Sequence, residues 1–72
     1  MAFYKNKKPT IFEEDMTKIY PVDHIFDEVD IANKSTKNLM ILNKIGPDGK
    51  PGAKDYFVRP HKTPAQEIDE IA

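Results

Sequence analysis

The chain has 72 residues, contains no cysteine and carries a net charge of −1, with 39% hydrophobic and 32% charged residues. A chain of this length and polarity forms one small domain with a thin core, and the lack of cysteine excludes disulfides and cysteine-based zinc or iron–sulfur sites. The first eight residues include lysines but no apolar stretch long enough for a signal peptide or membrane span, so we expect a location in the cytoplasm, or in a virion.

The N-terminal residues are predicted to be a basic arm outside the core, over residues 1–9, followed by a single domain over residues 10–72. Aromatic side chains supply contact area to a partner, and lysines supply attraction to an acidic surface. We therefore expect this arm to bind a partner and to be dispensable for folding. Its candidate partner-binding residues are Phe3, Tyr4, Lys5, Lys7 and Lys8.

A short helix is predicted over residues 11–19. Thr10 and Glu13 have the spacing of a capping box, and Pro21 ends the pattern because proline disfavours helical backbone at the residue before it. Apolar residues also recur at helical spacing, which gives one apolar stripe. These residues are Phe12, Met16, Ile19 and Tyr20.

An alternating pattern favours a strand over residues 25–31. Ile25, Val29 and Ile31 would share one face of that strand. A helical turn around Phe26 and Val29 is the alternative, because the polar row of the strand is interrupted there.

Residues 33–38 are all polar or basic and indicate a turn. The stretch over residues 39–45 is the most hydrophobic of the chain and predicts a strand. Its four consecutive apolar residues place it centrally, with Ile41 and Leu42 buried on opposite faces.

All three glycines and two prolines lie in residues 46–52, so neither a helix nor a regular strand can continue through this segment. We interpret it as a hairpin tip, with the return strand over residues 55–59. The tip is exposed and basic, which adds Lys50 to the candidate partner-binding residues. A terminal helix is predicted over residues 64–71, because Thr63, Pro64 and Gln66 match the chemistry of a helix start.

No constellation in the sequence indicates catalysis, and no catalytic, cofactor-binding or metal-binding residue is assigned. His24 could share a helical face with Asp27 and Glu28, but the spacing matches no known metal motif. Ser35 lacks the glycine-flanked turn that exposes a nucleophile, and no phosphate-binding glycine loop is present. We therefore expect the protein not to be an enzyme and to need no cofactor.

Charge is distributed in blocks along the chain. Residues 13–30 hold seven acidic residues and one lysine, whereas residues 34–62 hold seven basic residues and two aspartates. Such blocks can steer a charged partner, or they neutralise each other when they lie side by side. The basic block, with Tyr56 and Phe57, also leaves nucleic-acid binding open, although adjacent strand residues point to opposite faces.

The predicted fold class is α+β, with a small antiparallel sheet of about three strands and short flanking helices. A small mainly-β barrel or sandwich is the alternative. The predicted function is a structural or assembly accessory that docks onto a larger protein complex, for example a small virion component. Two alternatives remain: a small inhibitor or regulator that acts through an acidic surface, and a nucleic-acid-binding module. The oligomeric state is not predicted.

Overall fold

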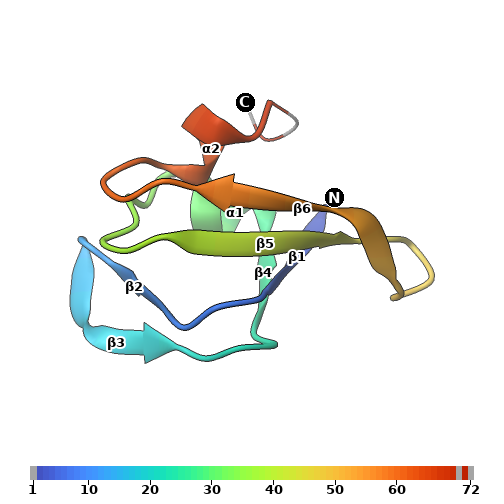
Figure 1. Ribbon diagram of the computed structural model, residues 1–72, viewed down its shortest axis with the longest axis horizontal. Helices are drawn as coiled ribbons and strands as arrows, with labels where there is room; N and C mark the ends of the chain where they lie inside the picture. The colour runs from blue at the N-terminus through green and yellow to red at the C-terminus, as the bar shows by residue number, and fades with distance from the viewer. Residues whose placement is uncertain (1, 70, 72) are drawn as a thin grey trace.

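A computed structural model describes residues 2–69 and residue 71. Within that part of the chain, four strands form one antiparallel sheet in the order β4-β1-β5-β6 (Figure 1). These strands are β1 (Phe3–Asn6), β4 (Ile25–Asp27), β5 (Met40–Ile45) and β6 (Pro51–Val58). A second, two-stranded sheet consists of β2 (Thr10–Phe12) and β3 (Asp15–Tyr20). The helices are α1 (Glu28–Ala32) and α2 (Pro64–Glu67).

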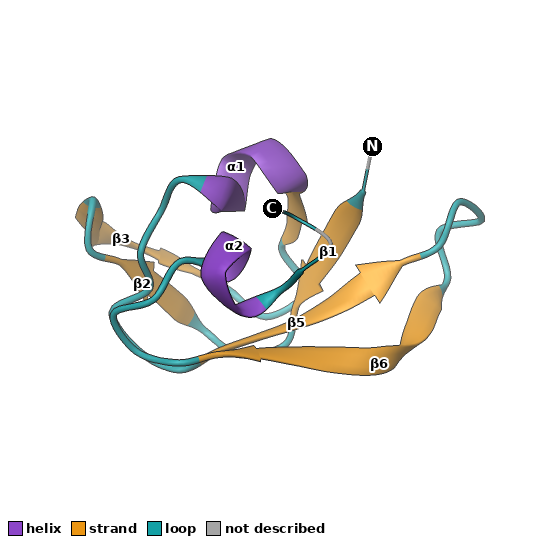
Figure 2. Ribbon diagram, turned by 90° about the horizontal axis from the view of Figure 1, so that it is seen from above, coloured by secondary structure: helices purple, strands orange, loops and turns teal. Residues whose placement is uncertain are grey.

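Both helices lie on the same side of the four-stranded sheet, and the β2–β3 hairpin lies beyond one end of it (Figure 2). The core fills the space between these layers, and four of its nine buried residues are aromatic. Among the described residues, no helix lies against the opposite face of the sheet, so its apolar side chains remain partly exposed. The nine core residues are Tyr4, Phe12, Tyr20, Phe26, Ile31, Met40, Leu42, Val58 and Ile68.

The predicted helix over residues 11–19 is wrong, because this segment forms the β2–β3 hairpin. Thr10 pairs with Tyr20 and Ile11 with Ile19. The apolar residues that suggested a helical stripe separate in the hairpin: Phe12 and Tyr20 enter the core, whereas Met16 and Ile19 are exposed. A pattern that fits a helical period over a few residues also fits two short strands, and long-range pairing decides between them.

The partner of β2 on its other side is a segment that the sequence indicated only as a turn. The amide of Glu13 donates to the Ser35 carbonyl at 2.8 Å, and the amide of Lys37 donates to the Ile11 carbonyl at 2.8 Å. The Asn38 side chain extends this pairing: its oxygen accepts from the Ile11 amide at 3.0 Å, and its nitrogen donates to the Pro9 carbonyl at 2.9 Å. Non-local hydrogen bonds therefore stabilise the strand conformation.

The N-terminal residues are not an arm outside the core, and this expectation is corrected. Strand β1 lies between β4 and β5, and its side chains Tyr4 and Asn6 are fully buried. The alternation in this strand explains the error, because Phe3 and Lys5 point to the open face while Tyr4 and Asn6 point inward. Lysines on one face of a strand are compatible with burial of the other face.

The predicted strand over residues 25–31 is half right. Strand β4 ends at Asp27, and α1 follows immediately. Asp27 caps this helix, because its carboxylate accepts from the Asp30 amide at 2.7 Å while the Asp30 carboxylate accepts from the Asp27 amide at 3.3 Å. The inward residue of β4 is Phe26, so Ile25 points outward and does not share a buried face with Ile31.

The predicted hairpin of residues 39–45 and 55–59 is confirmed as β5 and β6, and β5 is a central strand. Strand β6 begins earlier than predicted, at Pro51. Leu42 is fully buried, whereas Ile41 is only partly buried because no helix or strand in the described part of the chain covers the outer face.

Two antiparallel sheets and two short helices agree with the α+β class, although three strands were too few. The described residues form no closed barrel.

The terminal helix begins as predicted but is shorter. The Thr63 amide donates to the Gln66 side chain at 2.9 Å, and α2 ends at Glu67. Ile68 then adopts an extended backbone conformation and inserts its side chain into the core. Residue 70 of the predicted helix lies outside the described residues.

Candidate functional site

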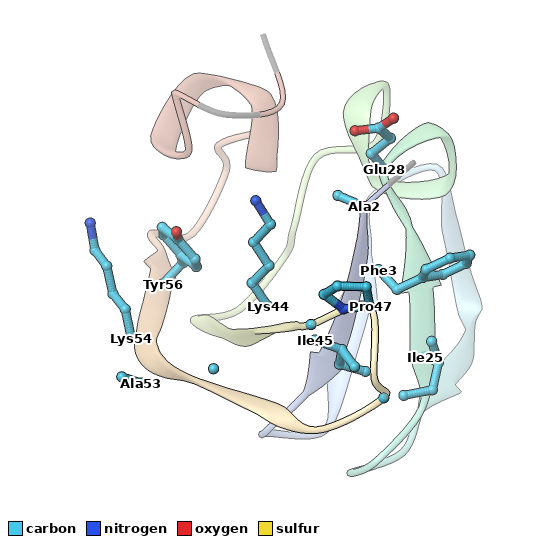
Figure 3. A pocket seen from close by; sticks show the side chains of 13 residues that line it. Ala2, Phe3, Ile25, Glu28, Lys44, Ile45, Pro47, Ala53, Lys54 and Tyr56 are labelled. Atoms are coloured by element: carbon cyan, nitrogen blue, oxygen red, sulfur yellow. The ribbon is translucent and has the colours of Figure 1, made fainter.

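An open groove lies at the end of the sheet where the β5–β6 hairpin extends past the start of β1 (Figure 3). Its volume is about 1040 Å³, and residues from β1, β4, α1, β5 and β6 line it. The lining residues are Ala2, Phe3, Ile25, Glu28, Lys44, Ile45, Gly46, Pro47, Gly49, Gly52, Ala53, Lys54 and Tyr56.

One wall of the groove is apolar. Phe3 and Ile25 come from the paired strands β1 and β4 and lie on the same face, because Phe3 pairs with Asp27 and Lys5 with Ile25. Phe3 is 45% exposed and Ile25 is 46% exposed. Two large apolar side chains at neighbouring positions therefore remain in contact with water.

The other wall is basic and aromatic. Lys54 and Tyr56 lie on β6, and Tyr56 faces the inner side of the sheet with Lys44, whereas Figure 3 shows the side chains of Phe3 and Ile25 pointing away from them on the far side of β1. The Lys54 ammonium lies 5.0 Å from the centre of the Tyr56 ring, within range of a cation–π interaction. Lys44 also lines the groove, and Glu28 is the one carboxylate among its lining residues.

A bulge in β6 curves the strand around this groove. The register of β5 and β6 shifts between Asn43 and Ile45, so that Asn43 pairs with Asp55 but Ile45 with Pro51. The Asn43 side chain fills the interrupted ladder: its oxygen accepts from the Gly52 amide at 3.0 Å, and its nitrogen donates to the Gly52 carbonyl at 3.0 Å. A methyl group at Gly52 would lie 2.7 Å from the Lys44 carbonyl oxygen, so the curve requires glycine there.

The six residues predicted to bind a partner do not form one surface. Phe3 lines the groove, and Lys50 lies at the exposed hairpin tip beside it. Tyr4 is in the core, with its ring 6.2 Å from that of Tyr56. Lys5 forms an ion pair with Asp23 at 3.5 Å on the outer face. The remaining two, Lys7 and Lys8, lie in the link between β1 and β2.

Sequence reasoning missed Ile25, Glu28, Lys44, Lys54 and Tyr56 as groove residues. Each belongs to an element that was at least partly predicted, but the groove forms only where the bulged hairpin curves towards β1. The two-residue shift between Asn43 and Ile45 has no signature in the hydrophobic pattern. The glycine-rich tip was the one available signal, since glycine in a strand often marks a bulge.

The carboxylates of the acidic block, residues 13–30, contact different partners within the fold. The Glu14 carboxylate accepts from the Ser35 amide at 2.8 Å, and this hydrogen bond lowers the pKa of Glu14 below its ordinary value. Glu13 contacts His61, and Asp15 accepts from the Thr17 hydroxyl at 2.9 Å. The remaining acidic residues cap α1, pair with Lys5 or line the groove.

The basic block includes a residue that is paired within the fold. Arg59 forms a two-pronged ion pair with Glu67, with distances of 2.9 and 3.2 Å. Tyr56 and Phe57 point to opposite faces of β6, as predicted, and Phe57 is 59% exposed. These residues do not form a flat platform of aromatic and basic side chains for stacked bases.

No group of three or more metal-ligating side chains converges anywhere in residues 2–69 or at residue 71. His24 packs against the rings of Tyr20 and Phe26 instead of joining Asp27 and Glu28. Among the helices of the described residues, none has the length and apolar character needed to cross a membrane. Comparisons with protein-family models, curated proteins and solved structures gave no match.

Proposed function

We propose that this chain is a non-enzymatic assembly accessory that docks onto a larger protein complex through the groove at the end of its sheet. A structural component of a virion is one example of such an accessory. The observation that carries the proposal is that one groove is lined by two exposed apolar side chains on the outer face of the sheet, Phe3 and Ile25, and by lysines on the inner face.

The occupant that fits this groove is a protein segment that passes around the end of the sheet, with a large apolar side chain on one side and carboxylates on the other. Burial of Phe3 and Ile25 against such a segment removes apolar surface from water, which favours association. Carboxylates of the segment would face Lys54 and, at the hairpin tip, Lys50, so that the charges are complementary. A volume of about 1040 Å³ exceeds that of one side chain and suits a short peptide segment.

The two rival functions receive less support. An inhibitor that acts as an acidic charge mimic needs its carboxylates on one surface, whereas Glu13, Glu14 and Asp23 each contact a different part of the chain. A nucleic-acid-binding module needs free basic side chains near exposed aromatic rings, whereas Arg59 is paired with Glu67.

A selection from a random peptide library displayed on phage tests the proposal, with the full chain as bait. We expect the selected peptides to combine aromatic or aliphatic residues with Asp and Glu. We also expect their affinity to fall as salt is raised, because exposed charges are screened. Selected peptides without acidic residues, or peptides that bind Lys54→Gln as well as the native protein, would contradict it. Lys37→Gln is the matched control, because Lys37 is exposed and does not line the groove.

A further inference from the structure

A second hollow, separate in its lining from the docking groove, lies between β3, β4 and α1 and has a volume of about 220 Å³. Aromatic side chains form its base, and two lysines, one histidine and one aspartate surround it. Its lining residues are Lys18, Tyr20, His24, Phe26, Asp30 and Lys34.

Two ammonium groups converge on the same aromatic ring in this hollow. The Lys18 ammonium lies 4.7 Å from the centre of the Tyr20 ring, and the Lys34 ammonium lies 5.7 Å from it. Lys34 is also 5.5 Å from the centre of the Phe12 ring. Tyr20 is only 8% exposed, so the ring provides a fixed base on which both cations rest.

Neither lysine is within salt-bridge distance of a carboxylate in the part of the chain that the structure describes. Asp30 lines the hollow, but its carboxylate also accepts a hydrogen bond from the Asp27 amide at 3.3 Å as part of the cap of α1. Among the residues that line the hollow, two cations therefore face one carboxylate. Outside this lining, the Glu14 carboxylate lies close enough to Lys34 for an electrostatic interaction. Like charges held close together repel each other, and an anion between them would offset that repulsion.

His24 supplies a third possible donor. Its ring lies 5.0 Å from that of Tyr20 and 4.6 Å from that of Phe26, which fixes its position in the hollow. Neither ring nitrogen of His24 has a hydrogen-bond partner among the described residues. A neutral imidazole can donate one hydrogen bond to an anion, and an imidazolium can donate more strongly.

We propose that this hollow binds a phosphate-class oxyanion, with Lys18 and Lys34 on either side and His24 as a further donor. A tetrahedral oxyanion offers several acceptor oxygens in different directions, which matches donors that arrive from three separate segments. The volume holds a phosphate group but leaves no room for a large ligand to be enclosed. The phosphate is therefore either free or the exposed end of a larger molecule.

Titrations of the full chain with inorganic phosphate and with adenosine monophosphate, followed by two-dimensional NMR at constant ionic strength, test this proposal. We expect saturable shifts at Lys18, His24 and Lys34. Equal affinity for the two ligands identifies free phosphate as sufficient, whereas tighter binding of the nucleotide identifies a phosphorylated molecule as the ligand. Shifts that do not saturate, or that sodium chloride reproduces, would overturn the proposal.

Lysine variants test whether phosphate binds in this hollow. The double variant Lys18→Gln and Lys34→Gln should weaken phosphate binding by about tenfold or more, since each lysine contributes a charge-assisted interaction. The matched control, Lys37→Gln and Lys62→Gln, removes two exposed lysines outside the hollow and should change affinity by less than about twofold. The variant Lys18→Arg and Lys34→Arg should retain binding. Equal weakening in the glutamine double variant and the control would sink the proposal.

Discussion

Asparagine side chains supply hydrogen bonds where backbone pairing is interrupted at three points in the described part of this chain. Asn6, Asn38 and Asn43 each bridge two segments, and each uses both its amide nitrogen and its carbonyl oxygen. An amide side chain can replace a peptide group in a ladder because it carries the same donor and acceptor. These side chains thereby connect segments at points where the regular backbone ladder ends or is interrupted.

Asn6 provides the sharpest test of this role. Its side chain is fully buried, donates to the Pro21 carbonyl at 2.9 Å and accepts from the Thr10 hydroxyl at 3.1 Å. Asn6→Ala should reduce the free energy of unfolding by about 1–3 kcal/mol, because buried partners lose their hydrogen bonds. Urea denaturation measures this change. The exposed residue Asn33 is the control, and Asn33→Ala should cost less than about 0.5 kcal/mol; equal losses would contradict the account.

The Arg59–Glu67 pair makes the free energy of unfolding depend on pH in the acid range. The hydrogen bonds from Arg59 lower the pKa of Glu67 below its ordinary value of 4.5. The pair therefore stabilises the fold fully above pH 4.5, and this stabilisation is lost as the pH falls through the lowered pKa. The difference in unfolding free energy between the native chain and Arg59→Gln should shrink over this range.

Lys37→Gln is the control for the acid titration, because it removes an exposed cation that does not contact Glu67. Its difference from the native chain should stay nearly constant over the same range. A difference between the native chain and Arg59→Gln that grows on acidification would contradict the assignment.

At the scale of elements, the features predicted correctly from the sequence are those that neighbouring residues determine. The run of apolar residues in β5 and the glycine-rich tip specify the hairpin, and Thr63 with Pro64 specifies the start of α2. The β2–β3 hairpin could not be predicted, because it depends on pairing with residues 35–38. The aspartate cap of α1 was missed because Asp27 and Asp30 differ from the usual capping pair.

The uncovered outer face of the sheet was not predicted either. It places two neighbouring residues of β5 in different environments. Leu42 points into the core and is fully buried, whereas Ile41 points to the uncovered face. Leu42→Ala should reduce the free energy of unfolding by about 2–5 kcal/mol, and Ile41→Ala by clearly less. Chemical denaturation of both variants compares the two faces. Equal costs would show that something covers the outer face.

At the scale of the whole molecule, the N-terminus is a structural element. Removal of residues 1–8 would take β1 out of the sheet and leave β4 without the strand that it pairs with. Tyr4 and Asn6 would also be lost from the interior. We expect the truncated chain to lose cooperative thermal unfolding and the dispersed amide signals of a folded protein. A truncated chain that still unfolds cooperatively would contradict the position of β1.

The groove depends on tertiary structure. It forms where the start of β1, the strand β4 and the curved β5–β6 hairpin come together. Phe3 was named from the sequence because it lies in a basic segment. In the structure it lines the groove because it is the first residue of β1 and points to the outer face. Of the residues that line the groove, only Phe3 was named from the sequence, and the same reasoning named Tyr4, which is buried. The basic wall of the groove could not be predicted, since the bulge that positions Lys54 is a tertiary feature.

The comparison of Phe3→Ser with Phe57→Ser tests docking in the groove most directly. Both phenylalanines are exposed and lie on strands, but Phe3 lines the groove and Phe57 does not. Isothermal titration calorimetry with the peptides selected on the native chain gives the affinity of each variant. We predict a loss of about tenfold or more for Phe3→Ser, as expected when a central aromatic contact is removed, and less than about twofold for Phe57→Ser. Unchanged affinity of Phe3→Ser, or an equal loss in both variants, would contradict docking in the groove.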